Sequence, residues 1–205
     1  MLSTQDTVLL VIDMQNGFLE PGGSMAKIGM DNEALRPALA GCVRLVEAAR
    51  EANVPVVYTR YVYQADYADA GLLPTVLVPA MKDVDSLAAG SWDADLVDQL
   101  TPAPGEIVID KSRPSAFYGT RLEPVLTSLG ARNLVLCGVT TNICIETTAR
   151  DAGQRDYHVH VAADATAEFD PAKHEHALGT IGFAFGWVDS VDDVLGAWSA
   201  DPAAG

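Results

Sequence analysis

The sequence predicts an α/β fold in which a mostly parallel, doubly wound sheet of about six strands lies between two layers of helices. The first indication is the alternation of short apolar runs with longer amphipathic stretches along the chain. The second is that the apolar runs are nearly continuous, which is typical of parallel strands covered on both faces. Together they indicate a three-layer α/β/α sandwich of the Rossmann-like kind.

Five apolar runs are the predicted strands: residues 7–13, 54–60, 106–111, 133–138 and 157–163. Five amphipathic or alanine-rich stretches are the predicted helices: residues 32–52, 120–129, 144–154, 171–184 and 191–198. In the first of these, apolar side chains recur at steps of three and four residues from Leu35 to Ala49, which places them on one face. Residues 61–92 interrupt the rhythm, and a connection this long is usually functional. We therefore expect it to shape the substrate pocket.

The composition suits a single domain over residues 1–205, with residues 200–205 as a loose tail. Apolar residues make up 49% of the chain and charged residues 20%, which is enough apolar material for a core. The net charge of −15 argues against nucleic acid or an anionic membrane as a partner, since both favour a basic face. The N-terminus lacks a basic signal segment, and the three cysteines form no disulfide framework. We therefore expect a cytoplasmic protein.

Three reactive side chains follow three of the predicted strands. Asp13 ends the first strand, Lys111 ends the third, and the fourth leads through a short turn to Cys144. Ligands of open α/β sheets bind beyond the carboxyl ends of the strands, so we expect these groups to meet at one edge. Taken alone, Cys144 could be a packed small residue, a metal ligand or a nucleophile. Its place where a strand passes into a helix favours a thiolate.

The combination of these groups indicates covalent hydrolysis. Asp13 would accept the thiol proton, Lys111 would stabilise the thiolate, and Cys144 would attack an amide or ureide carbonyl. Backbone N–H groups of the turn before Cys144 would bind the oxyanion. This chemistry needs a small-molecule substrate but no cofactor and no metal.

Three blocks of the sequence resemble the hallmark blocks of the isochorismatase-like cysteine hydrolases: VLLVIDMQNGF, IVIDKSRPSAFYGT and LVLCGVTTNICIETTARDA. The resemblance implies the triad of Asp13, Lys111 and Cys144. It also implies a cis peptide bond between Val139 and Thr140, and an oxyanion hole made by the backbone amides of Thr140 and Cys144. The fold it implies is the α/β/α sandwich, assembled into dimers or tetramers.

Within this superfamily, the chain most resembles ureidoacrylate amidohydrolases and biuret hydrolases. The similar segments are residues 13–31, residues 90–100 together with 185–193, and GVTTNIC. Since both groups act on ureido or carbamoyl compounds, the resemblance implies a small ureide, carbamoyl or amide substrate. Residues 61–87 depart from the pattern, so they are expected to determine which one.

Three alternatives stay open at this point: a vinyl-ether hydrolase of the isochorismatase type, a nicotinamidase-like amidase, and a non-catalytic binding module. Isochorismatases often lack the cysteine that this chain keeps. Nicotinamidases typically carry metal-binding histidines after the second strand, where YTRYVYQADYADAGL has none. The four histidines lie downstream and are expected to be structural or solvent-facing: His158, His160, His174 and His176.

Position along the chain also gives candidates for the substrate pocket. They follow the first strand, flank the long connection or follow Lys111: Gln15, Asn16, Phe18, Tyr61, Trp92, Arg113 and Phe117. Aromatic walls with a few polar anchors suit a small planar amide. An arginine in such a pocket can pair with a substrate carboxylate in a bidentate fork.

Overall fold

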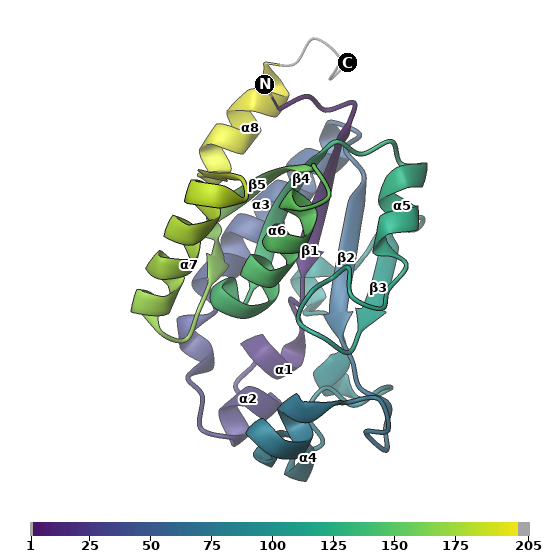
Figure 1. Ribbon diagram of the computed structural model, residues 1–205, viewed down its shortest axis with the longest axis vertical. Coiled ribbons are helices and arrows are strands. Elements are labelled where there is room, and N and C mark those ends of the chain that lie inside the picture. The colour runs from purple at the N-terminus through teal and green to yellow at the C-terminus, as the bar shows by residue number, and fades with distance from the viewer. Residues whose placement is uncertain (1, 201–205) are drawn as a thin grey trace.

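The computed structural model describes residues 2–200 and is built around a six-stranded, all-parallel sheet (Figure 1). The strands are β1 (Thr7–Ile12), β2 (Val56–Tyr61), β3 (Ile107–Lys111), β4 (Asn133–Val139), β5 (His158–Ala167) and β6 (Trp187–Asp189). Their order is β3-β2-β1-β4-β5-β6. The chain builds outwards in one direction from β1 and in the other from β4, as in a doubly wound fold. The predicted fold class is confirmed.

Helices cover both faces of the sheet. They are α3 (Pro37–Glu51), α5 (Leu122–Ser128), α6 (Glu146–Gly153), α7 (Pro171–Ala184) and α8 (Val191–Ser199). Helices α3 and α8 pack together on one face, while α5, α6 and α7 cover the other, which is the nearer face in Figure 1. All residues of β1 and β4 are therefore buried, which explains their continuous apolar sequences.

Short segments form a cap beyond the carboxyl ends of β1, β2 and β3, at the lower end of Figure 1. We define the cap as α1 (Asn16–Leu19), α2 (Ser24–Lys27) and residues 61–95, which include η2 (Leu73–Leu77), α4 (Ala80–Asp83) and η3 (Trp92–Ala94). The buried carboxylate of Asp93 joins its parts, because it accepts hydrogen bonds from Ser24 N at 2.7 Å, Ser24 Oγ at 2.6 Å and Leu87 N at 2.8 Å. The long connection is thus a folded unit over the strand ends.

Two helix predictions were wrong at their starts. Residues 32–34 form a separate 3₁₀ turn, η1 (Asn32–Ala34), and α3 begins only at Pro37. Proline is favoured in the first turn of a helix, because its missing N–H would have no partner there. The predicted helix at residues 144–154 starts instead as a π-turn, η5 (Thr141–Ile145), which passes into α6. Cys144 therefore lies inside an irregular turn.

The other differences lie towards the C-terminus. Strand β5 runs on to Ala167, beyond the predicted end at residue 163, and β6 was not located by the sequence. Another 3₁₀ turn, η4 (Asp98–Leu100), precedes β3. The predicted loose tail lies outside the described residues except for Ala200, which caps α8. Among residues 2–200, no helix has the length and apolar character needed to cross a membrane.

Candidate active site

Asp13 directly follows β1 and is completely buried. Its backbone has a φ of 54°, in the left-handed region where aspartate is tolerated better than most residues. Its Oδ1 accepts a hydrogen bond from Thr59 Oγ1 on the neighbouring strand at 2.7 Å. Its Oδ2 lies 2.6 Å from Lys111 Nζ. Thr59 therefore fixes one carboxylate oxygen and leaves the other at the centre of the site.

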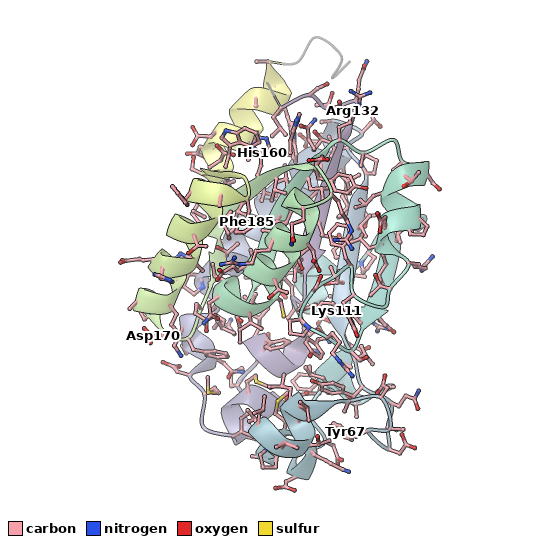
Figure 2. All side chains as sticks on the ribbon, in the orientation of Figure 1. Tyr67, Lys111, Arg132, His160, Asp170 and Phe185 are labelled. Atoms are coloured by element: carbon pink, nitrogen blue, oxygen red, sulfur yellow. The ribbon has the colours of Figure 1, made fainter. Side chains whose placement is uncertain are left out.

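Lys111 reaches this carboxylate from two strands away, because β2 lies between β3 and β1. Neighbouring strands are about 4.8 Å apart, so only a long side chain can bridge the gap. The lysine crosses the ring of Tyr61, with Nζ 4.2 Å from the ring centroid. Nζ also lies 3.5 Å from Cys144 Sγ and 3.2 Å from the carbonyl oxygen of Arg113. The ammonium thus contacts both the carboxylate and the thiol. Figure 2 labels Lys111, which ends β3.

The turn that presents Cys144 begins at Gly138. Gly138 has a φ of 116°, and a Cβ at this position would lie 2.0 Å from the carbonyl oxygen of Ile12. Only glycine therefore allows β4 to pass so close to the end of β1. The peptide bond between Val139 and Thr140 is cis, as the resemblance implied. The Thr140 carbonyl oxygen then accepts hydrogen bonds from the backbone N–H groups of Ile143 and Ile145, at 3.3 and 3.1 Å.

The surroundings of the Cys144 thiol favour its neutral form. Burial raises the pKa of the Cys144 thiol to about 12; the Lys111 ammonium opposes this increase, and the Asp13 carboxylate adds to it. The side chain is only 4% exposed. The expectation that position at a helix start would give a thiolate is therefore corrected, because loss of solvation outweighs the charge of Lys111. The thiol needs a base at the moment of attack.

Two of the predicted pocket residues hold the cap on the sheet. The Gln15 amide donates from Nε2 to the carbonyl oxygens of Tyr61 and Ala94, at 3.0 and 2.8 Å. Its Oε1 accepts from the Tyr61 N–H at 2.7 Å. Asn16 Nδ2 donates to the carbonyl oxygen of Trp92 at 2.9 Å. Both side chains therefore hydrogen-bond to the backbone of the cap. The sequence had predicted that they contact the substrate.

The remaining candidates for the substrate pocket differ in their burial and in their contacts with the triad. Phe18 and Tyr61 are buried, and Tyr61 lies against Lys111. The Trp92 side chain is 53% exposed and lies near Gly22, where a Cβ would be 3.8 Å from its ring. Arg113 packs over Gly71 in the cap. Of these four, Tyr61 contacts Lys111 through its ring and Arg113 contacts it through its backbone carbonyl oxygen.

Phe117 lies near the amino ends of the strands, whereas the triad lies at their carboxyl ends. The prediction that Phe117 lines the pocket was therefore wrong. Its ring is 6.1 Å from the ring of Tyr157 and beneath the guanidinium of Arg155. Tyr157 immediately precedes β5, at the amino ends of the strands. The seven residues of β4 separate the two edges by about 20 Å. Sequence proximity to Lys111 misled the prediction, because the chain runs along α6 after Arg113.

Sequence reasoning missed Thr59, which orients Asp13, and Tyr63, which lies next to Tyr61. The rings of Tyr61 and Tyr63 are 5.2 Å apart. Both hydroxyl oxygens are buried. The period of two in YVY places these rings on the same side of the chain, so the pattern could have identified Tyr63.

Three of the four histidines have side-chain partners, and His174 contacts the turn that carries Cys144. His158 and His160 contact Asn133 and Asp189, and His174 Nδ1 lies 2.9 Å from Thr141 Oγ1. Across residues 2–200, no three His, Cys, Asp or Glu side chains gather in a way that could hold a metal ion.

Curated proteins with similar sequences include several named ureidoacrylate amidohydrolases. The RutB protein of Methylorubrum extorquens AM1 is 41% identical over 209 residues, which cover 96% of this chain and 84% of that protein. The RutB protein of Azorhizobium caulinodans is 35% identical over 213 residues, covering 98% of this chain and 94% of its own length.

Solved structures of similar fold include a cysteine hydrolase from Pseudomonas syringae pv. phaseolicola 1448A, with a TM-score of 0.85 and 29% identity over 97% of this chain and 95% of that one. The N-carbamoylsarcosine amidase from Thermoplasma acidophilum has a TM-score of 0.73 and 28% identity, over 91% of this chain and 97% of its own. The isochorismatase domain matches residues 7–193. This chain belongs to the isochorismatase family.

Proposed function

We propose that this protein is an amidohydrolase that cleaves a C–N bond of a small ureide, carbamoyl compound or amide through a thioester on Cys144. The observation that carries the proposal is the position of the Lys111 ammonium, 2.6 Å from Asp13 Oδ2 and 3.5 Å from Cys144 Sγ in a buried site. A thiol, a carboxylate base and a charge partner are the groups that nucleophilic acyl transfer requires. The names of the RutB relatives and of the N-carbamoylsarcosine amidase support this substrate class.

The first half of the reaction forms the acyl-enzyme. Asp13 Oδ2 accepts the proton from Cys144 Sγ as the sulfur attacks the carbonyl carbon. The carbonyl oxygen becomes an oxyanion, which the backbone N–H groups of Thr140 and Cys144 stabilise. Asp13 then donates its proton to the leaving nitrogen as the C–N bond breaks. Ammonia or an amine leaves, and the acyl group stays on sulfur as a thioester.

The second half restores the thiol. Asp13, again a carboxylate, accepts a proton from a water molecule that attacks the thioester carbonyl. The C–S bond breaks, and the proton held by Asp13 returns to Sγ. The product leaves as a carboxylic or carbamic acid. Lys111 stays charged throughout, and its ammonium stabilises negative charge on the carboxylate and on sulfur in turn. No step of this reaction passes through a metal ion.

The test compares wild-type protein with Cys144→Ala on 3-ureidoacrylate, biuret, N-carbamoylsarcosine, nicotinamide and isochorismate. Release of ammonia from a ureide or amide is expected in the wild type, and its kcat should fall on the order of 10⁴-fold in the variant. Mass spectrometry of the quenched wild type should find the acyl adduct on Cys144.

The matched control is Cys42→Ala, which removes another buried thiol, in α3, and should retain wild-type turnover. Isochorismate cleavage that survives Cys144→Ala, with no C–N substrate turned over, would assign the protein to vinyl-ether hydrolysis. Turnover of nicotinamide alone would assign it to the nicotinamidase-like class.

We also infer assembly into a dimer or tetramer in the cytoplasm. Support comes from exposed apolar side chains on α7 and the edge strand β6, where Phe183 is 91% exposed and Trp187 53%. Light scattering on the purified chain should give a multiple of 21.7 kDa, and the mass of a single chain would contradict the inference.

A further inference from the structure

A buried carboxylate that the proposed reaction does not use lies against the turn that presents Cys144. Glu168 directly follows β5 and is only 8% exposed. Its Oε2 accepts a hydrogen bond from the Asn142 N–H at 3.3 Å, and its Oε1 accepts one from the Phe169 N–H at 2.9 Å. Glutamate is seldom buried without partners of this kind. Each oxygen therefore holds one backbone N–H, and one of the two belongs to the turn.

An irregularity of the sheet brings this carboxylate to the turn. Strands β4 and β5 pair in parallel, and their register shifts between Leu136 and Gly138, where β5 carries extra residues. Beyond the shift, Ala167 at the end of β5 lies opposite Val139 at the end of β4. Bulges of this kind are frequent next to active sites, where they redirect a side chain. The two chains therefore leave the sheet side by side, one to Glu168 and the other to the turn.

The same turn has a second anchor, His174, near the start of α7. Helix α7 packs against η5, and His174 Nδ1 lies 2.9 Å from Thr141 Oγ1. Thr141 is fully buried, so this contact keeps its hydroxyl from being a buried polar group without a partner. Figure 2 labels Asp170, which caps the start of α7 between Glu168 and His174.

The His174 imidazole makes this contact without a charge. Burial lowers the pKa of His174 below its ordinary value, although the charges of Glu168 and Glu175 oppose this decrease. The ring is therefore neutral at pH 7, with one nitrogen as donor and the other as acceptor. Nδ1 and the Thr141 hydroxyl can then bond in either direction. The ring thus fixes the position of Thr141 and supplies no charge to the turn.

The anchored residues, Thr141 and Asn142, lie between the two N–H groups proposed to bind the oxyanion, those of Thr140 and Cys144. The turn is closed internally by the Thr140 carbonyl oxygen, which accepts hydrogen bonds from two N–H groups further along η5. Its two middle residues are the ones that α7 and the end of β5 hold from outside. Since a misplacement of about 1 Å can cost roughly 100-fold in rate, the shape of this turn should affect catalysis.

We propose that His174 and Glu168 are positioning residues, which hold residues 140–144 in the shape that aims the N–H groups of the turn at the oxyanion. The inference rests on the proposed function and adds two residues that act on the reaction through the backbone. Their effect is confined to the transition state, because the oxyanion develops only there. Loss of either anchor should therefore lower kcat and leave KM nearly unchanged.

Paired substitutions at the two ends of the contact test this role, with the C–N substrate of the panel above that the wild type turns over fastest. Thr141→Val and His174→Leu remove the hydrogen bond, and each should lower kcat about 10- to 100-fold with KM within about twofold of wild type. Thr141→Ser and His174→Asn keep a hydrogen-bonding group at the contact and should recover most of kcat. Asparagine is smaller than leucine, so a mere packing role for His174 would give the opposite order.

The double variant Thr141→Val with His174→Leu should lose no more activity than either single variant, since both changes remove the same contact. Glu168→Gln leaves one acceptor oxygen for two N–H groups and should lower kcat about threefold to tenfold. His176→Leu is the matched control, because it makes the same substitution two residues further along α7, where the side chain is exposed. It should keep wild-type kcat.

Amide hydrogen exchange, measured by mass spectrometry on peptides covering residues 138–146, tests the turn without any substrate. Exchange there should be faster than in the wild type in Thr141→Val, His174→Leu and Glu168→Gln, because local opening of the turn becomes easier. It should stay at the wild-type rate in His174→Asn and His176→Leu. Exchange in β1 should stay the same in all variants, which separates loss of the anchors from general destabilisation.

Wild-type kcat in Thr141→Val and His174→Leu, a change in KM instead of kcat, or a higher kcat in His174→Leu than in His174→Asn would overturn the inference. Unchanged exchange of the turn would overturn it too. These outcomes differ from failure of the proposed function. If no C–N substrate is turned over but exchange of the turn depends on both anchors, the hydrolysis proposal falls and the anchoring stands. If all variants hydrolyse ureides equally well, the anchoring falls alone.

Discussion

Replacing Asp13 by Asn is expected to lower kcat for ureide hydrolysis about 10⁴-fold, because the neutral thiol of Cys144 then has no base to accept its proton. The change also leaves the Lys111 ammonium buried without a counter-charge, since both side chains of this ion pair are fully buried. Breaking a buried pair costs about 3–5 kcal/mol, which lowers the melting temperature of a chain this size by roughly 10 °C. Steady-state kinetics and thermal unfolding measure the two effects.

The double variant Asp13→Asn with Lys111→Met separates these effects. Replacement of both partners by uncharged side chains is often tolerated in a protein interior. The double variant should therefore regain most of the lost thermal stability and none of the activity. An Asp13→Asn protein with more than a tenth of wild-type kcat would contradict the role of the base. A double variant no more stable than the single one would contradict the ion pair.

Gly138→Ala is expected to have the largest effect on folding. The added Cβ would lie 2.0 Å from the carbonyl oxygen of Ile12 and 2.8 Å from its N, at a φ of 116°. Both contacts are with backbone atoms of a central strand, so neither can move without breaking the pairing of β1 with β4. We expect destabilisation above about 4 kcal/mol and loss of more than roughly 10 °C in melting temperature. Hydrolysis should be lost as well, because Asp13 directly follows Ile12.

Gly105→Ala is the matched control for that substitution. Gly105 has a similar φ of 95°, but nothing lies within 4 Å of a Cβ built there. Alanine at position 105 should therefore destabilise the fold by about 1–2 kcal/mol through its left-handed backbone conformation alone, because the added Cβ clashes with nothing. A melting temperature lowered equally in both variants would show that the close approach of β4 to β1 is not the reason for the glycine.

The parts of the fold predicted from sequence are those with a strong periodic pattern. Strands β1 and β4 are buried on both faces, so their apolar runs are unbroken and their positions could be read directly. Strand β6 has three residues at an exposed edge, too few for any period to appear. The predicted start of α3 lies five residues too early, because Leu35 continues the apolar spacing of the helix although Pro37 is its first residue.

The sequence could predict that Asp13, Lys111 and Cys144 meet, because all three follow parallel strands and the carboxyl ends of such strands share one edge. It could not predict which later residues turn back towards that edge. Arg113 and Phe117 are four positions apart, but only Arg113 stays beside the nucleophile. The difference depends on packing against α6 and the cap, which the local sequence does not encode. Burial of the thiol had the same origin, since α7 and β5, which pack against the turn that carries Cys144, follow it in the chain and are not encoded by the local sequence.

Cys144 combines a side chain that is only 4% exposed with a pKa of about 12. Oxidation of cysteine by peroxide follows thiolate character and exposure. A thiol whose pKa is raised in this way is almost entirely protonated at pH 7, and its burial shields the sulfur from solvent. The resting protein is therefore expected to survive oxidative stress with its nucleophile reduced, and to be vulnerable only during the part of the catalytic cycle in which substrate has opened the site.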